Sequence, residues 1–278
     1  MSATVTEAEA GPTVRARRGR GRWGDQILYA YTCAIVAWLC LPIAVMIAFG
    51  FNDAKGRLNL TWQGFTVKWY GKLFAVPDLT TALVNSLTIA ILAALGATVL
   101  GTLIGLALGR YRFRGQGALN LVQFAAISAP ETVMGASLLS FFVQSGVGRG
   151  YLTILVSHIM FSLSFVAVTV RARVLTLDPF VEEAARDLGA SGWTTFRLVT
   201  LPMIFPAVLA GGLLAFALSI DDFIITSFNS GSTLTFPLWI WGAQKQGLPP
   251  QVNVMGTLIF LAGVLLAVGN AVLARRRR

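Results

Sequence analysis

The sequence is poor in charge and in the residues that build catalytic or metal centres. Only 12% of its 278 residues are Asp, Glu, Lys or Arg, whereas 55% are hydrophobic, a composition far from that of a soluble globular domain. His158 is the only histidine, so a catalytic or metal site that needs several histidines has no material. We therefore expect a membrane protein that is not an enzyme and that has no catalytic residues, no metal and no cofactor.

Two further absences limit the chemistry. Cys33 and Cys40 are the only cysteines, and seven residues of helix hold their backbones about 10 Å apart, too far for a disulfide. No G-x-x-x-x-G-K-[S/T] phosphate-binding motif occurs in the chain. If ATP drives this protein, the energy must come from another chain.

Six apolar runs dominate what the sequence does contain. Each is long enough to cross the hydrocarbon core of a bilayer, which takes about 20 helical residues. The sequence therefore predicts an all-α integral membrane protein with six transmembrane helices, at residues 27–51, 82–108, 119–143, 151–170, 206–228 and 254–273. Along the second run, small residues recur every four positions and let a neighbouring helix approach closely, at Ala97, Gly101, Gly105 and Gly109.

The basic residues predict the orientation. Sixteen Lys and Arg lie on the side that holds both termini and the 178–206 segment, and six lie on the other side. By the positive-inside rule we expect both termini in the cytoplasm of a bacterial cell, with a multi-pass chain in the inner membrane. The Arg-rich tail, residues 1–26, then acts as an inside signal. A nucleic-acid-binding arm is the less favoured alternative, and the apolar run that follows the tail is too long for a signal peptide.

The polar segment 52–80 connects the first two apolar runs. Aromatic and apolar residues recur in it at helical spacing, at Phe65, Trp69, Tyr70, Leu73 and Phe74. This pattern predicts an amphipathic helix at the membrane interface.

A second polar and charged segment, 178–206, interrupts the apolar runs. Asp178, which is followed by Pro, forms a helix start, because its side chain accepts from free first-turn N–H groups and Pro has no N–H to lose. Gly189 can take the left-handed conformation that ends a helix, and Ser191 can cap a second helix over 193–200. We therefore predict a helix of about three turns, a bend and a second helix before the fifth span.

This segment carries a motif that resembles one of a known family. The order is Glu183-Ala184-Ala185, three residues, Gly189, nine residues, then Val-Thr-Leu-Pro at 199–202. It is similar to the EAA signature of permease subunits in binding-protein-dependent ABC importers, which prefers Ile at the position of Val199.

The resemblance implies that the segment is a coupling helix, which docks into a cleft of a cytoplasmic ATPase and passes its closure to the membrane helices. It implies a coupling role for Glu182, Glu183, Ala184, Ala185, Asp187 and Gly189. The alternative from the residues alone is a loop whose amphipathic helices only lie on the membrane surface.

Three acidic residues lie within the predicted spans, where an ionisable side chain costs about 2.5 kcal/mol or more and is a functional candidate by default. Glu131 lies near the middle of the third span beside a proline that can break the helix, and Asp221 and Asp222 lie in the outward half of the fifth. Together they could form a path for a cation. In the alternatives, the Pro-Glu break is architectural, and the aspartates reach the outer interface, cap a broken helix or pair with Arg149 or Lys245.

A longer resemblance covers about two thirds of the chain. It is to one branch of these permeases, the PotC-type subunits of spermidine/putrescine importers, and it rests on six segments: Asn-Ser-Leu at 85–87, Ser-Ala-Pro-Glu at 128–131, Ser-His at 157–158, the EAA segment at 183–190, Ser-Ile-Asp-Asp-Phe at 219–223 and Pro-Gln-Val-Asn at 250–253. The Arg-rich tail departs from that branch.

This resemblance implies a type I importer (MetI-like) fold: a second permease subunit, two copies of an ABC ATPase and a periplasmic or surface solute-binding protein. The implied permease domain is 27–278, with a core at about 82–273. The implied cargo is putrescine or spermidine, whose ammonium groups bind to carboxylates and aromatic faces. The aromatic candidate beside the three acids is Trp239.

Other interpretations stay open. The same importer could carry another amine, an organic acid, a phosphonate or iron. A channel or ion-coupled secondary transporter could use Glu131, Asp221 and Asp222 as a proton relay, although such a protein needs no ATPase-docking loop. His158 could line the path, although a packing role is favoured. A membrane-embedded enzyme has little support, and we expect lipid contact but no nucleic-acid partner.

Overall fold

The computed structural model describes residues 22–56 and 58–276. Within these residues the chain is helical, with a single isolated β-bridge between Asn52 and Phe65. Its contacts divide the chain into two compact units, Met1–Val45 and Met46–Arg278. The predicted tail, residues 1–26, lies almost entirely outside the described residues.

The helices follow one another with short connections. α1 (Arg22–Phe49) begins in the first unit and ends in the second. The second unit then holds α2 (Lys68–Gly71), α3 (Pro77–Arg110), α4 (Gln116–Ser128), α5 (Glu131–Gln144), α6 (Tyr151–Val174), α7 (Phe180–Asp187), α8 (Gly192–Thr195), the π-helical turn η1 (Phe196–Thr200), α9 (Leu201–Ile220), α10 (Ile224–Asn229), α11 (Phe236–Ala243) and α12 (Pro250–Arg276).

Five helical stretches in the described part of the chain are long and apolar enough to cross a membrane: α1, α3, α6, α12 and the run Gly192–Ile220, which joins α8, η1 and α9. A sixth is obtained if α4 and α5, which meet at an angle of 110°, count as one broken span. Five of the six predicted apolar spans are therefore confirmed as helical stretches, and the predicted span at 119–143 corresponds to the bent pair α4 and α5.

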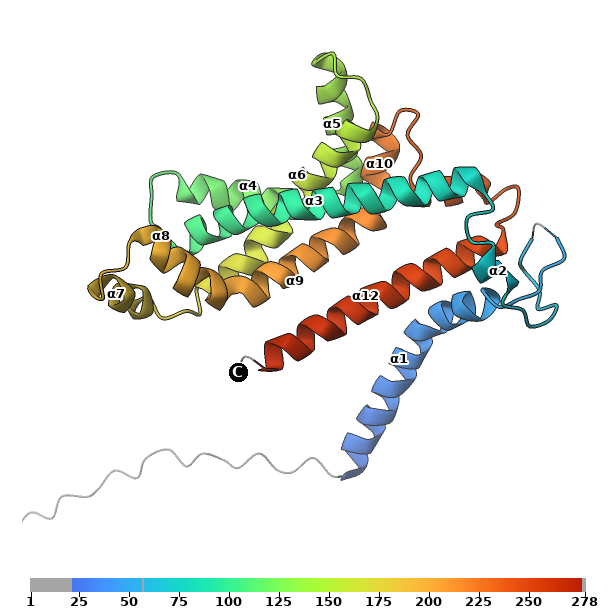
Figure 1. The fold of residues 1–278 in the computed structure, drawn as a ribbon, viewed down its shortest axis with the longest axis horizontal. Coiled ribbons are helices and arrows are strands. Elements are labelled where there is room, and N and C mark those ends of the chain that lie inside the picture. Colours follow the sequence, from blue (N-terminus) through green and yellow to red (C-terminus); the bar gives the residue numbers. More distant parts are fainter. Residues whose placement is uncertain (1–21, 57, 277–278) are drawn as a thin grey trace, which may run out of the picture. The chain divides into compact units, whose positions relative to one another are not determined.

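The centre of the second unit is a bundle of α3, α6 and α9 (Figure 1). α3 and α6 run parallel, because Gly96 faces Ile159 and, further along both helices, Gly109 faces Val174. The chain then turns back through α7 and α8, so α9 runs antiparallel to both. α7 and α8 consequently lie at the end of the bundle where α3 and α6 finish (Figure 1).

The small-residue stripe of α3 makes this close packing possible. A Cβ atom on Gly105 would lie 2.7 Å from the carbonyl oxygen of Ala167, and one on Gly101 would lie 2.9 Å from that of Leu163. A backbone oxygen cannot swing aside as the end of a side chain can, so a larger residue must push the helices apart. Ala97 is fully buried between the same helices. The predicted packing role of the stripe is confirmed.

The fifth span differs from its predicted bounds at both ends. It begins earlier, because the chain is helical from Gly192 onward and holds Pro206 inside the helix. The π-helical turn η1 ends at Thr200, two residues before Pro202, and shifts the register of the backbone hydrogen bonds, so the missing N–H of this proline does not end the helix. The span also ends earlier, at Ile220, so Asp221 and Asp222 lie in a break between α9 and α10.

The predicted interfacial helix at 65–74 is wrong, since α2 covers only Lys68–Gly71. A loop organised by Asn52 takes its place. The Asn52 amide group donates to the side-chain oxygen of Asn59 and to the Thr61 carbonyl oxygen, both at 2.7 Å, and its own oxygen accepts from the Gln63 N–H at 2.7 Å. A buried side chain that supplies these bonds competes with helix formation, which the spacing of the aromatics could not reveal.

Candidate functional site

The segment between α6 and α9 forms a compact helix–turn–helix, and we call residues 178–200 the coupling loop. α7 starts after Asp178, whose Oδ1 accepts from the N–H of Phe180 at 3.0 Å. Gly189, with a φ of +87°, closes the helix, and the oxygen of Ser191 accepts from an N–H of α8. The predicted start, bend and second helix are confirmed, although α7 has 8 residues and thus about two turns.

One face of the coupling loop is open. Of the residues predicted to couple, Ala185 is half-buried, and four are exposed: Glu183, Ala184, Asp187 and Gly189. Large apolar side chains are exposed beside them, with Leu188 at 89% and Phe180 and Trp193 also largely uncovered. We call this combination of acidic and apolar side chains the docking face.

Glu182 is set apart from that face. Its two carboxylate oxygens each lie 3.1 Å from a guanidinium nitrogen of Arg110 at the end of α3, and Oε1 also accepts from the Thr200 hydroxyl at 2.9 Å. The side chains of Arg110 and Glu182 are only 18% and 16% exposed. Glu182 therefore binds inward, to the membrane helices.

Two broken helices meet at the other end of the bundle. α4 and α5 are separated by Ala129 and Pro130, and Glu131 is the exposed first residue of α5. α5 packs against α10, where Gly135 leaves room for the ring of Phe228. Through this contact, the start of α5 belongs to the element packed against α10, which directly follows the break that holds both aspartates. The structure thus brings the three predicted acids into one region.

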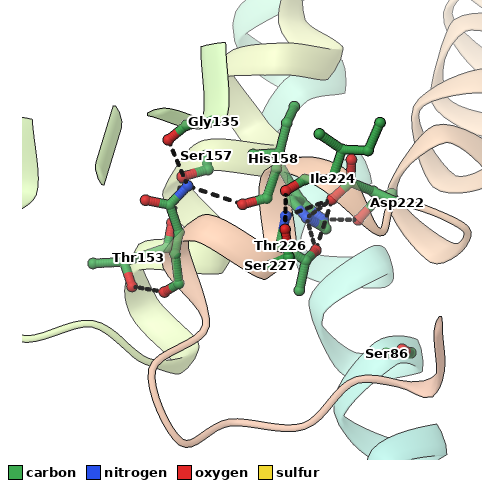
Figure 2. A network of polar contacts seen from close by, with 12 residues as sticks. Ser86, Gly135, Thr153, Ser157, His158, Asp222, Ile224, Thr226 and Ser227 are labelled. Atoms are coloured by element: carbon green, nitrogen blue, oxygen red, sulfur yellow. Dashed lines mark hydrogen bonds and ion pairs between the residues drawn. The ribbon is translucent and has the colours of Figure 1, made fainter. Parts of the chain in front are cut away.

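Within that region Asp222 is a buried structural residue. It is 7% exposed, and its Oδ2 accepts from the backbone N–H of Thr226 at 2.8 Å and from its hydroxyl at 2.7 Å. Figure 2 shows this carboxylate turned toward His158, whose Nε2 lies 3.2 Å away. Asp222 therefore caps α10 and attaches it to α6, the arrangement that one of the alternatives above describes.

His158 is satisfied on both ring nitrogens. Nε2 lies 2.8 Å from the Thr226 hydroxyl oxygen, and because that hydroxyl donates its proton to Asp222, Nε2 is the donor. Nδ1 lies 2.7 Å from the hydroxyl oxygen of Ser219, near the end of α9. The favoured packing role of His158 is confirmed, and the residue joins α6, α9 and α10 (Figure 2).

Asp221 faces the other way. It is exposed and borders a cavity of about 520 Å³ together with the aromatic residues Phe223, Trp241 and Phe260. The rings of Phe223 and Trp241 pack with their centroids 5.0 Å apart. A carboxylate beside aromatic faces is a favourable environment for an organic cation. Asp222 does not line this cavity.

Trp239, the predicted aromatic candidate, lies away from this cavity. Trp239 packs, partly buried, against a core cluster formed by Leu79 of α3 and residues of α11 and α12, and it does not border the cavity. Trp241 does border it and is 62% exposed. Residues two apart on a helix point to nearly opposite sides, so α11 uses one tryptophan for packing and shows the other to the cavity.

The described residues hold no group of three or more His, Cys, Asp and Glu side chains arranged to bind a metal ion. Residues 101–278 match the family model for the inner membrane component of binding-protein-dependent transport systems. The chain belongs to this family.

Curated relatives of this permease extend the match over nearly the whole chain. The spermidine/putrescine transport system permease protein PotC of Escherichia coli K12 is 40% identical over 88% of this chain and 92% of its own length. The PotC of Haemophilus influenzae is 39% identical over 89% and 96%. The putrescine transport system permease protein PotI of E. coli K12 is 38% identical over 87% and 88%. The chain is therefore a PotC-type permease.

Solved structures support the same fold for the permease. A chain of a bacterial ABC transporter involved in alginate import has a TM-score of 0.65 at 16% identity, covering 94% of this chain and 99% of the other. A chain of the MetNI methionine ABC transporter in an inward-facing conformation has a TM-score of 0.59 at 16% identity, covering 71% and 95%. The predicted MetI-like membrane fold is confirmed.

Membership in this family fixes the general role of the chain. It is a multi-pass membrane subunit of an ATP-driven importer, and permeases of this kind work with an ATPase and a periplasmic binding protein. The absence of a phosphate-binding motif agrees with an ATPase on a separate chain.

Proposed function

We propose that this permease carries polyamines, putrescine or spermidine, into the cell. The observation that carries the proposal is the cavity where the exposed carboxylate of Asp221 meets the rings of Phe223 and Trp241. An ammonium group over an aromatic face gains about 0.5–2 kcal/mol, and a nearby carboxylate adds charge attraction. The polyamine names of the PotC and PotI relatives support the same cargo.

Glu131 supplies the next negative charge along the path. It is exposed at the start of α5, the helix that packs against α10 just after Asp221. A polyamine carries ammonium groups separated by short methylene chains, so one group at Asp221 leaves another free to reach Glu131. The apolar wall of the Asp221 cavity suits the methylene groups between them.

The docking face of the coupling loop binds the ATPase. Glu183 and Asp187 provide charge, and Leu188 provides an apolar contact that enters the partner's cleft. The small side chains of Ala184 and Ala185 allow close approach. The complex contains two ATPase copies, a second permease subunit and a solute-binding protein, with the coupling loop and both chain termini in the cytoplasm.

Reconstitution of the complete complex in proteoliposomes tests this function. With ATP inside and the solute-binding protein outside, spermidine or putrescine should accumulate and should raise the ATPase rate. If neither polyamine accumulates or raises the ATPase rate, but an organic acid, a phosphonate or iron does both, the cargo belongs to that other class. Uptake driven by an ion gradient in vesicles that lack the ATPase would contradict the importer mechanism.

A further inference from the structure

The coupling loop is attached to the membrane helices by one carboxylate. We propose that Glu182, bound to Arg110 and Thr200, is the positioning residue that transmits movement of α7 into α3 and α9. This inference rests on the proposed function, and it gives Glu182 a different task from the other residues of the loop.

The contacts of Glu182 connect three elements. Arg110 is the last residue of α3, and Thr200 is the last residue of η1, directly before α9. Both carboxylate oxygens lie 3.1 Å from the guanidinium group, and Oε1 also accepts from Thr200 at 2.9 Å. A two-point contact with a guanidinium fixes the orientation of the carboxylate as well as its position.

In the described part of the chain, no other side chain of α7 makes a hydrogen bond or ion pair to a membrane-spanning helix. Among the residues that the structure describes, Glu182 is the side chain of α7 that hydrogen-bonds to a membrane-spanning helix, whereas Glu183 and Asp187 are exposed and make no side-chain hydrogen bond or ion pair. The backbone connections of α7 pass through bends, at Leu175 to Pro179 on one side and Gly189 on the other. A bend absorbs rotation, so the side-chain tie is the stiffer route.

The bundle can receive this movement as one body. α3 packs on α6 through Gly101 and Gly105, whose Cβ positions are occupied by backbone oxygens of α6, so these two helices do not slide independently, and α9 packs on both helices. A force applied at Arg110 and Thr200 therefore acts on two packed helices at once. The cavity at Asp221 lies at the far end of one of them.

The first test compares Glu182→Gln with a charge exchange, Arg110→Glu combined with Glu182→Arg, in the complete reconstituted complex. Glu182→Gln should still assemble with the ATPase but should lower spermidine uptake per ATP hydrolysed by about fivefold or more. The exchange should restore most of that loss, because the pair is re-formed with its charges reversed. Arg112→Gln, an exposed arginine two residues further along, is the matched control and should transport normally.

Two results would overturn the proposal. One is normal uptake per ATP in Glu182→Gln. The other is an exchange variant no better than either single change, which would place the partner of Glu182 on the ATPase. If Glu182→Gln does not assemble, assembly of the exchange variant gives the answer. Recovery of the complex supports the pairing of residues 110 and 182, and continued loss of the complex contradicts it.

A second measurement does not depend on the cargo. Spin labels at Val181→Cys in α7 and Leu214→Cys in α9, with Cys33 and Cys40 changed to Ser, report whether the two helices move together when ATP binds. Their separation should stay constant with Glu182 present and should change in Glu182→Gln. A constant separation in both would contradict the tie, whereas a wild-type complex indifferent to polyamines would contradict only the proposed cargo.

Discussion

Two pairs of adjacent acids lie near opposite ends of the same long helix, and they are built alike. In Glu182-Glu183 and in Asp221-Asp222, one acid binds inward to a basic side chain and a threonine, and its neighbour is exposed. Glu182 and Glu183 are neighbours on a helix and point about 100° apart, and the two aspartates in the break after α9 also face different ways, so each pair can hold a structure with one member and meet a partner with the other. In the coupling loop the exposed acid belongs to the docking face, and after α9 it borders a cavity.

The two inward acids differ in their access to water. Asp222 and His158 have side chains that are 3% and 2% exposed, whereas Glu182 and Arg110 keep 16% and 18%. Removal of one partner from a buried pair leaves a charge or polar group that water cannot reach, which is the costly case. We therefore expect loss of the Asp222–His158 pair to lower the stability of the fold, and loss of the Glu182–Arg110 pair to weaken the transmission of movement from α7 to the bundle.

The largest effect should come from His158→Ala. This change removes the ring that faces Asp222 and leaves the hydroxyl of Ser219 without its partner, so we expect a loss of about 3–5 kcal/mol of stability. Thermal unfolding of the purified permease in detergent measures it. Arg110→Ala is the matched change in the more exposed pair and should lower the stability clearly less. Equal losses of stability in the two variants would mean that the two pairs do not differ in their contribution to folding.

Gly189→Val tests the turn that presents the exposed acid of the coupling loop. At a φ of +87° a β-branched residue is strained by about 1–2 kcal/mol, so α7 should end differently and the docking face should lose its geometry. We expect the variant to insert in the membrane while uptake per ATP falls. Gly192→Ala is the control, because a Cβ at that position meets nothing within 4 Å; normal coupling in Gly189→Val would show that the turn is not needed.

Asp221→Asn removes the charge of the exposed acid at the cavity. Uptake of spermidine should fall about tenfold, an effect of about 1.4 kcal/mol, with the melting temperature unchanged. Asp78→Asn, an exposed aspartate in the first turn of α3, serves as the control. Unchanged uptake in Asp221→Asn, or an equal loss in Asp78→Asn, would mean that Asp221 does not meet the cargo.

The smallest effect should come from Trp241→Ala, since one aromatic face at an exposed site contributes about 0.5–1 kcal/mol to the binding of a cation. We expect the spermidine concentration for half-maximal uptake to rise about threefold. Trp239→Ala should instead lower the melting temperature, because that ring packs against the core. A raised half-maximal concentration in Trp239→Ala and a lowered melting temperature in Trp241→Ala would instead indicate that Trp239 lines the substrate path.

Sequence patterns predicted the features that depend on local chemistry. Each span needs a long apolar run, so hydropathy located five spans and the bent pair α4 and α5, and the turn at Gly189 follows from the one residue type that accepts its backbone angle. The stripe of small residues on α3 likewise predicted a close contact with a neighbouring helix.

Features that depend on distant partners were not predictable in this way. Arg110 and Glu182 are 72 residues apart and His158 and Asp222 are 64 apart in the numbering, so no local pattern shows that these acids are already bound. The choice between Trp239 and Trp241 depends on which side of α11 meets α3, which spacing alone leaves open. The mistaken helix at 65–74 failed because one buried asparagine organises the loop.

The unbroken helix from Gly192 to Ile220 has a mechanical consequence. Near Gly211 and Gly212 it lies close to Val166 and Thr98, where an added Cβ atom would be 3.2 Å and 2.8 Å from their side chains. If the helix tilts there, its arms measure about 29 Å toward the coupling loop and about 13 Å toward the cavity. Such an unequal lever turns a wide displacement at the coupling loop into a shorter displacement, with greater force, at the end beside the cavity.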